Sequence, residues 1–90
     1  MAALLVTYDL NKETKRPKIV PAIKKLCDSW ARLSESSYAI RTRKSPKTVY
    51  DELVHLLDNN DTLYVINLSR PYYGQGPQEV NDWLEDNLPR

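Results

Sequence analysis

Cysteine, glycine and long apolar runs are all scarce in this chain of 90 residues. The single cysteine, Cys27, excludes an internal disulfide and agrees with a reducing compartment. No apolar run approaches the roughly 20 residues that a helix needs to cross a membrane. The apolar N-terminal stretch is short, lacks a basic flank and ends at Asp9, so we expect no secretory signal. These absences predict a cytoplasmic protein, of a bacterium or a bacterial virus, with no membrane partner.

Several motifs of known chemistry are absent from the sequence as well. The chain has no Walker-type phosphate loop, no GxGxxG motif and no Cys/His cluster with metal-binding spacing. His55 is the only histidine, and its position on a helix favours a surface residue over a general base. Cys27 falls on an apolar helix face, which favours a buried, inert thiol. Any enzymatic chemistry would therefore depend on a metal ion and on the positioning of phosphates.

Charge is distributed unevenly along the chain, although its net value is only +1. Residues 12 to 47 hold eleven of the thirteen Lys and Arg residues and three acids, a net charge of +8. Residues 48 to 90 hold eight acids and two arginines, a net charge of −6. Such asymmetry predicts either an anionic partner or self-association, while two solvated surfaces remain the alternative.

Strand-like and helix-like apolar patterns alternate along the sequence. Ser45 and Pro46 have the pattern of a helix cap and a first-turn proline. The expected strands are residues 3–10, 31–33, 37–42 and 63–68, with a tight turn at 34–36. Three helices are expected. The first buries residues 19, 22, 23, 26, 27 and 30, the second buries 49, 53, 56 and 57, and the third buries 80, 83, 84 and 88. The order is βαββαβ with an additional C-terminal helix. We therefore predict one α+β domain, residues 1–90, with a ferredoxin-like fold.

The first strand is apolar on both of its faces, with Leu4 and Val6 on one side and Ala3 and Leu5 on the other. Both main helices of this fold cover the same sheet face, and the other face of an antiparallel sheet is either solvated or buried against a partner; the apolar second side of this strand favours a covering layer. A homodimer is the simplest source of that layer. The C-terminal helix, folded back on the sheet, is the alternative.

Asp9 is the first candidate site residue, because it ends the apolar strand at the rim of the sheet. One carboxylate makes a weak metal site, whereas two of them across a symmetry axis can hold a hydrated Mg²⁺. Such an ion lowers the pKa of a bound water and stabilises a phosphoryl transition state. The alternative is structural: Asp9 and Asn11 would form local side-chain turns after the strand.

Basic and aromatic residues supply the remaining candidates. Helix N-termini attract anions, and each phosphate contact makes binding salt-dependent. The predicted anion-binding residues are Asn11, Lys12, Lys15, Arg16, Arg41, Arg43, Lys44, Lys47 and Arg70. Tyrosines can stack on bases, and the candidates are Tyr8, Tyr72 and Tyr73. The alternatives are a solubilising basic rim and a tyrosine hinge packed against a dimer partner.

Several stretches together resemble the small bacterial proteins of the SinR family. They are residues 6–11, 22–26, 29–30, 56–61, 63–66 and 83–84. That family resembles the CRISPR-associated ferredoxin-like proteins that scaffold spacer integration as dimers, and the VapD toxin ribonucleases. Tyr8-Asp9 matches the Tyr-Asp pair that ends the first strand in the CRISPR-associated proteins. Residues 71 to 77 depart from those proteins, since a Pro/Gly loop and a helix replace their usual fifth strand.

The resemblance implies a homodimer in which two Asp9 carboxylates approach and hold one Mg²⁺. We therefore predict a nucleic-acid-binding protein with metal-dependent endonuclease activity, in a bacterial or phage defence setting. Two other functions agree with the sequence. One is a non-enzymatic module that binds a nucleotide or a cyclic oligonucleotide signal at the dimer interface. The other is a protein-interaction scaffold that uses its acidic C-terminal helix.

Overall fold

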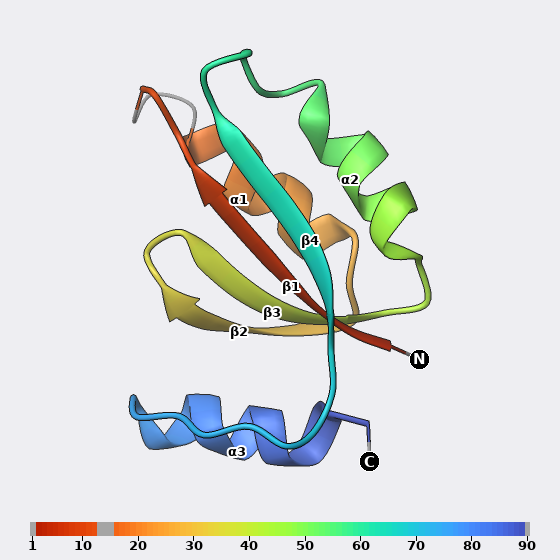
Figure 1. Ribbon diagram of the computed structural model, residues 1–90, viewed down its shortest axis with the longest axis vertical. Coiled ribbons are helices and arrows are strands. Elements are labelled where there is room, and N and C mark those ends of the chain that lie inside the picture. The colour runs from red at the N-terminus through yellow and green to blue at the C-terminus, as the bar shows by residue number, and fades with distance from the viewer. Residues whose placement is uncertain (1, 13–15, 90) are drawn as a thin grey trace.

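The chain forms a four-stranded antiparallel sheet with helices on both faces (Figure 1). This computed structural model describes residues 2–12 and 16–89, except for the side chain of Arg16. The element order is β1 (Ala2–Asp9), α1 (Arg16–Lys25), β2 (Ser29–Ser34), β3 (Ser37–Thr42), α2 (Pro46–Val54), β4 (Thr62–Leu68) and α3 (Gln78–Asn87). The strand order is β2-β3-β1-β4. The predicted α+β, ferredoxin-like fold with an added C-terminal helix is confirmed.

One sheet face, called the first face here, is covered by α1 and α2. Alternation along β1 directs Leu4, Val6 and Tyr8 to this side, where all three are buried. Each large apolar side chain that leaves water contributes about 1.5–3 kcal/mol to folding. The helices contribute Ile19, Ile23, Val49 and Leu53 to the same core, all fully buried. This cluster is the main hydrophobic core of the protein.

Helix α1 ends earlier than the apolar spacing predicts. It stops at Lys25, so Cys27 lies beyond it and Trp30 lies in β2, where its side chain is 41% exposed. The reason is long-range: Trp30 pairs with Ile40 of β3. Pairing with β3 therefore decides the conformation of Trp30, which the helical spacing places on the first helix, while the predicted strand at residues 31–33 is confirmed and extends over 29–34.

Helix α2 begins as predicted. The hydroxyl of Ser45 accepts a hydrogen bond from the backbone N–H of Thr48 at 3.1 Å, and Pro46 occupies the first turn. The helix ends at Val54, so Leu56 and Leu57 lie in the turn after it and still pack against the main core. None of the helices in the described part of the chain is long and apolar enough to cross a membrane.

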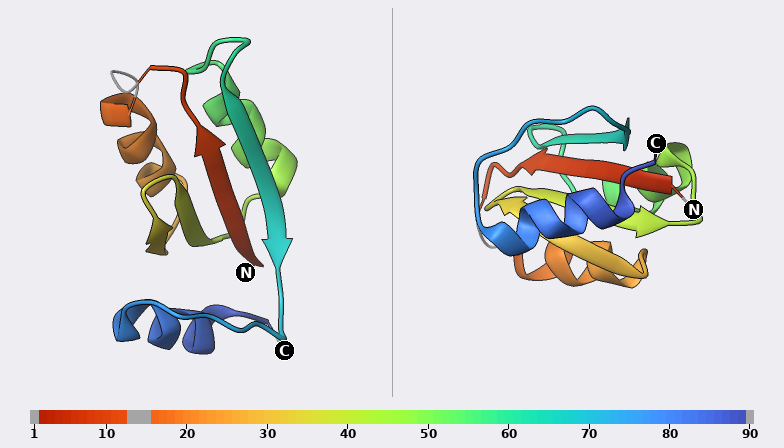
Figure 2. Two further views of the ribbon diagram at one scale, coloured as in Figure 1. Left: turned by 60° about the vertical axis from the view of Figure 1, so that its left-hand side comes forward. Right: turned by 90° about the horizontal axis from the view of Figure 1, so that it is seen from below.

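The other face, called the second face, is covered only at one end. Helix α3 packs there through Leu84 and Leu88 over Ala3 and Ala39 (Figure 2). Alanines at these sheet positions let the helix approach closely. The rest of the face is open: the side chains of Tyr64 and Ile66 in β4 are 61% and 50% exposed. The C-terminal helix thus supplies part of the predicted second layer and leaves an apolar area uncovered.

Candidate nucleic-acid interface

The predicted site residues lie at two opposite ends of the sheet. The pairing of Ala2 with Thr42 and of Thr7 with Ser37 puts the start of β1 beside the end of β3. Asp9 therefore lies at the far end of β1, roughly 24 Å from Ala2 at about 3.4 Å per residue. Lys12 follows Asp9, whereas residues 43 to 47 follow β3. The two predicted basic groups do not form one site within one copy of the chain.

Asp9 and Asp61 play different roles at the first of these ends, called the carboxylate end here. Asp9 is exposed and pairs in register with Thr62. Asp61 accepts hydrogen bonds from the backbone N–H of Asn11 at 2.6 Å and of Asp58 at 2.9 Å. Asp61 thus ties Asn11, just after β1, to the turn at residues 58–61. The Asp9 carboxylate is not used in that arrangement.

A magnesium ion needs more ligands than one copy offers at this end. Among residues 2–12 and 16–89, no three His, Cys, Asp or Glu side chains gather as metal ligands. Mg²⁺ requires six oxygen ligands, and Asp9 supplies at most two. Both carboxylate oxygens of Asp61 already accept backbone hydrogen bonds. Among the described residues, Asp9 therefore has no further carboxylate cluster to share a magnesium ion with, and its predicted role relies on a second copy.

At the opposite end, three cations surround a hollow of about 250 Å³, called the basic hollow here. Lys25 comes from the last turn of α1, while Arg43 and Lys44 follow β3. The buried Thr42 hydroxyl donates to the carbonyl of Leu26 at 2.8 Å and accepts from the N–H of Lys44 at 3.1 Å. The first bond, together with the backbone bond from the Asp28 N–H to the Arg41 carbonyl at 2.9 Å, ties the end of β3 to the segment after α1, and the second holds Lys44 beside Thr42. They bring together cations that lie far apart in the sequence.

The cations at this end of the sheet differ in whether a nearby acid offsets their positive charge. The ammonium of Lys47 lies 2.7 Å from Asp51, which raises the pKa of Lys47. The ammonium of Lys44 lies 3.9 Å from Glu52. Lys25 and Arg43 form no ion pair with any described residue. These two residues therefore supply most of the uncompensated positive charge.

Cys27 and Asp28 also line the basic hollow. The thiol donates a weak hydrogen bond to the carbonyl of Lys24 at 3.6 Å. Partial burial, followed by the charge of Asp28, raises the pKa of the Cys27 thiol. A thiol with a raised pKa is a poor nucleophile at neutral pH. Cys27 is therefore only partly buried, and its environment still favours the protonated thiol.

The three tyrosines proposed for base stacking have different environments. The prediction that Tyr8 stacks on a base is wrong. Its side chain is 3% exposed in the main core, and its hydroxyl donates to the carbonyl of Glu35 at 3.3 Å. The hydroxyl of Tyr72 lies 3.1 Å from the Glu85 carboxylate, which holds the ring against α3. Tyr73 is 99% exposed. Of the three, only Tyr73 presents a free ring.

The remaining predicted anion-binding residues do not extend the basic hollow. The Arg70 guanidinium lies 2.9 Å from the Glu85 carboxylate and also donates to the carbonyls of Glu85 and Leu88. Arg70 therefore fixes the loop between β4 and α3 to the end of α3. Arg41 is exposed on the α3 side of β3, two residues from Ala39. Lys15 and the side chain of Arg16 lie outside the described part of the chain.

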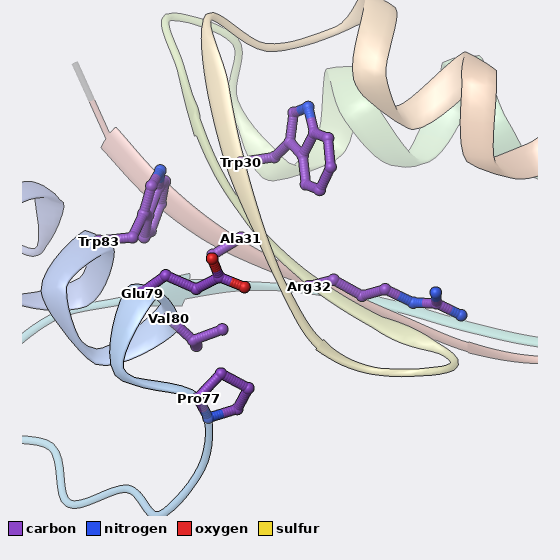
Figure 3. Close-up of a pocket in the computed structure, with 7 residues that line it drawn as sticks. All are labelled: Trp30, Ala31, Arg32, Pro77, Glu79, Val80 and Trp83. Carbon is purple, nitrogen blue, oxygen red and sulfur yellow. The ribbon is translucent and has the colours of Figure 1, made fainter.

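A second concavity, called the β2 cleft here, has a volume of about 450 Å³ and lies beside edge strand β2 (Figure 3). Its lining residues are Trp30, Ala31, Arg32, Pro77, Glu79, Val80 and Trp83. The sequence did not reveal it, because Trp30 had been assigned to a helix. The ammonium of Lys24 lies 4.2 Å from the centre of the Trp30 ring, and the Tyr38 ring meets it edge-on at 5.7 Å. Lys24 thus occupies one face of the indole.

Comparisons with known proteins support the fold alone. No protein-family model matches the chain, and no curated protein matches it. Among solved structures, it is similar to the crystal structure of a hypothetical protein, TT1823, from Thermus thermophilus. The two share 20% sequence identity with a TM-score of 0.61, over 84% of this chain and 94% of that one. At this identity the likeness shows a common fold and carries no functional information.

Proposed function

We propose that the protein binds nucleic acid as a homodimer and contacts phosphates through Lys25, Arg43 and Lys44. The observation that carries the proposal is the convergence of these cations around the basic hollow, with Lys25 and Arg43 uncompensated. Arg and Lys contacts to phosphates provide most of the sequence-independent affinity of nucleic-acid-binding proteins. The acids of the second half of the chain lie mainly on α2 and α3, and of these Glu52 lies near Lys44, whereas none of the described acids forms an ion pair with Lys25 or Arg43. Among the residues that line it, only Asp28 is acidic.

The open part of the second face supports the dimer. Tyr64 and Ile66 of β4 are large apolar side chains that are 61% and 50% exposed. Exposed apolar surface of this kind usually marks an interaction site, and two-fold dimers are the commonest assembly. A dimer carries two copies of the basic hollow on one particle. Contact of both with one nucleic acid increases the overall affinity through avidity.

A metal-dependent nuclease activity is the second part of the proposal. Alternation along β1 puts Asp9 on the same side of the sheet as Leu5 and Thr7, the side that α3 covers incompletely. A dimer formed through this side can bring two Asp9 carboxylates together. Such a pair supplies −2 of charge for a hydrated Mg²⁺ ion, which would polarise a phosphodiester and activate water.

Binding is tested by the fluorescence anisotropy of labelled 20-nucleotide RNA and DNA strands in increasing KCl. The proposal predicts an affinity that falls as salt rises, with a log–log slope of about −2 to −3 for two or three phosphate contacts per copy. No binding at 50 mM KCl, or binding that does not depend on salt, would contradict it.

The dimer and the nuclease activity are tested separately. Sedimentation should show a dimer for the native protein and a monomer when Tyr64→Asp and Ile66→Asp are combined. Incubation with Mg²⁺ should cleave the strands, and Asp9→Asn should abolish cleavage while leaving binding intact. If native protein cleaves no strand, or if Asp9→Asn cleaves as well as native protein, the nuclease part fails and the binding part stands.

A further inference from the structure

Strand β2 forms an outer edge of the sheet, and the β2 cleft opens along it. An edge strand presents backbone N–H and C=O groups that no neighbouring strand pairs. Figure 3 shows Trp30 and Arg32 extending on one side of β2, while Pro77, Val80 and Trp83 lie on the other. The strand is therefore flanked by two walls of different composition.

We propose that the β2 cleft binds an extended peptide of a partner protein, which adds a fifth strand along β2. The main-chain groups of the edge would supply affinity, and the two walls would select alternate side chains of the peptide. This inference goes beyond nucleic-acid binding. It concerns a different surface and a different class of partner.

The wall formed by α3 and the residue before it favours apolar side chains. Pro77, Val80 and the Trp83 ring line this side, and Trp83 is held in place by donation from its indole N–H to the Ser29 hydroxyl at 3.1 Å. Ala31 has only a methyl group on the strand itself. Ala31 is only 6% exposed, so an incoming side chain would rest on Pro77, Val80 and the Trp83 ring beside it, not on the strand itself.

The opposite wall favours acidic side chains. The ammonium of Lys24 lies over the Trp30 ring, and the Arg32 guanidinium lies 6.0 Å from the Tyr38 ring. The Arg32 guanidinium donates to the backbone carbonyls of Ser34 and Glu35, which are uncharged, so its positive charge is not cancelled there. An extended peptide with acidic residues at alternate positions matches this wall, and apolar residues between them match the other.

Charge also argues for a peptide over the other occupants. Helix α3 carries four acids and no base, and the Glu79 carboxylate points toward β2 in Figure 3, so this wall repels anions. A peptide can direct its acidic side chains to the Arg32 wall alone because its side chains alternate, whereas a phosphate backbone carries a charge at every nucleotide. A second copy of β2 would bring another Lys24 and Arg32 against the first pair. The register shift between Arg32 and Ser34 further limits straight pairing to residues 29–32. The bound segment should therefore be short.

The test uses fluorescein-labelled hexapeptides with alternating Asp and Leu residues and measures their anisotropy on native protein. N-methylation of every second residue removes either the backbone N–H groups that face β2 or those that face solvent. The inference predicts that one methylation pattern weakens binding at least tenfold and that the other changes it less than twofold. Equal effects of the two patterns, or no binding of the parent peptide, would overturn it.

Charge reversal in the cleft provides the second readout. Arg32→Glu should weaken binding of the Asp–Leu peptide about tenfold and should improve binding of the matching Lys–Leu peptide. Lys24→Glu repeats this test without disturbing the β2–β3 turn, because Arg32 bonds to that turn and Lys24 does not. His55→Glu, at the exposed C-cap of α2, is the control and should change neither affinity.

Two further outcomes would show that a molecule other than a peptide occupies the β2 cleft. In the first, a (dT)₁₂ strand displaces the Asp–Leu peptide equally well from native protein and from the Lys25→Glu, Arg43→Glu double variant. That result would assign the cleft to nucleic acid. Dissociation of the dimer on peptide addition would assign the cleft to a second copy. Loss of nucleic-acid binding alone, with peptide binding retained, would refute the proposed function and leave this inference intact.

Discussion

The basic end of the sheet and its carboxylate end differ in what their charged side chains do. At the carboxylate end, both oxygens of Asp61 bind backbone N–H groups and hold the loop. At the basic end, the buried Thr42 hydroxyl bonds to the backbone and holds it, and the cations of Lys25 and Arg43 form no ion pair with a described acid. The comparison shows that the Asp61 carboxylate is used to hold the backbone, whereas the charges of Lys25 and Arg43 are left available because a neutral hydroxyl holds the backbone beside them.

The largest expected effect concerns the basic hollow. Combining Lys25→Glu with Arg43→Glu should weaken nucleic-acid binding about 50-fold at 100 mM salt and should reduce the salt slope by about two. Each substitution removes one phosphate contact and adds repulsion. Anisotropy titration of one labelled strand measures both quantities.

The matched control lies at the opposite end of the molecule. Lys12→Glu with Lys18→Glu changes the net charge by the same amount, and it should weaken binding less than fivefold. Equal losses in the two double variants would mean that net charge, not the basic hollow, determines affinity.

The next effect separates the two aspartates of the carboxylate end. Asp61→Ala should destabilise the protein by about 1–2 kcal/mol, because the N–H groups of Asn11 and Asp58 lose their acceptor. Asp9→Ala should change the free energy of unfolding by less than about 0.5 kcal/mol, as expected for an exposed side chain. Urea unfolding of both variants measures the difference. Similar losses would show that Asp9 also supports the fold.

A smaller effect is expected where α3 meets the loop. Arg70→Ala should destabilise the protein by about 1 kcal/mol, since the loop loses its bonds to Glu85 and Leu88. Arg70→Lys should recover little, because an ammonium lacks the planar fork that reaches several acceptors. Nucleic-acid affinity should stay unchanged in both variants. Its loss would place Arg70 in the binding surface.

The smallest effect concerns the thiol beside the basic hollow. Because the pKa of Cys27 is raised in the folded protein, the unfolded chain loses the thiol proton first as pH rises. Stability from this group is complete below the unfolded pKa, near 8.5, and falls as pH increases above it. Cys27→Ser should remove this part of the pH dependence. Thermal unfolding between pH 7 and 10 compares the two proteins.

Much of the fold could be predicted from local patterns. Alternation in residues 37–42, the Ser45-Pro46 cap and the apolar run before Asp9 each determine one element, and the structure agrees within a residue or two. The end of α1 could not be predicted, because residues 29–34 take their conformation from pairing with β3, which is a long-range contact.

The candidate site was harder to predict for the same reason. Arg43 and Lys44 were identified from their density in the sequence, but Lys25 joins them through long-range bonds, from the Thr42 hydroxyl to the Leu26 carbonyl and from the Asp28 N–H to the Arg41 carbonyl. Lys12 belongs to the same basic half of the sequence and lies at the other end of the sheet. Charge spacing in a sequence does not report strand register, and register decides which cations meet.

The most direct test of nucleic-acid binding at the basic hollow is amide chemical-shift mapping of ¹⁵N-labelled protein titrated with an unlabelled oligonucleotide. The account predicts the largest shifts at Lys25, Thr42, Arg43 and Lys44, with small shifts from Asp9 to Lys12. Largest shifts at Asp9 to Lys12, or no shifts at millimolar oligonucleotide, would contradict it.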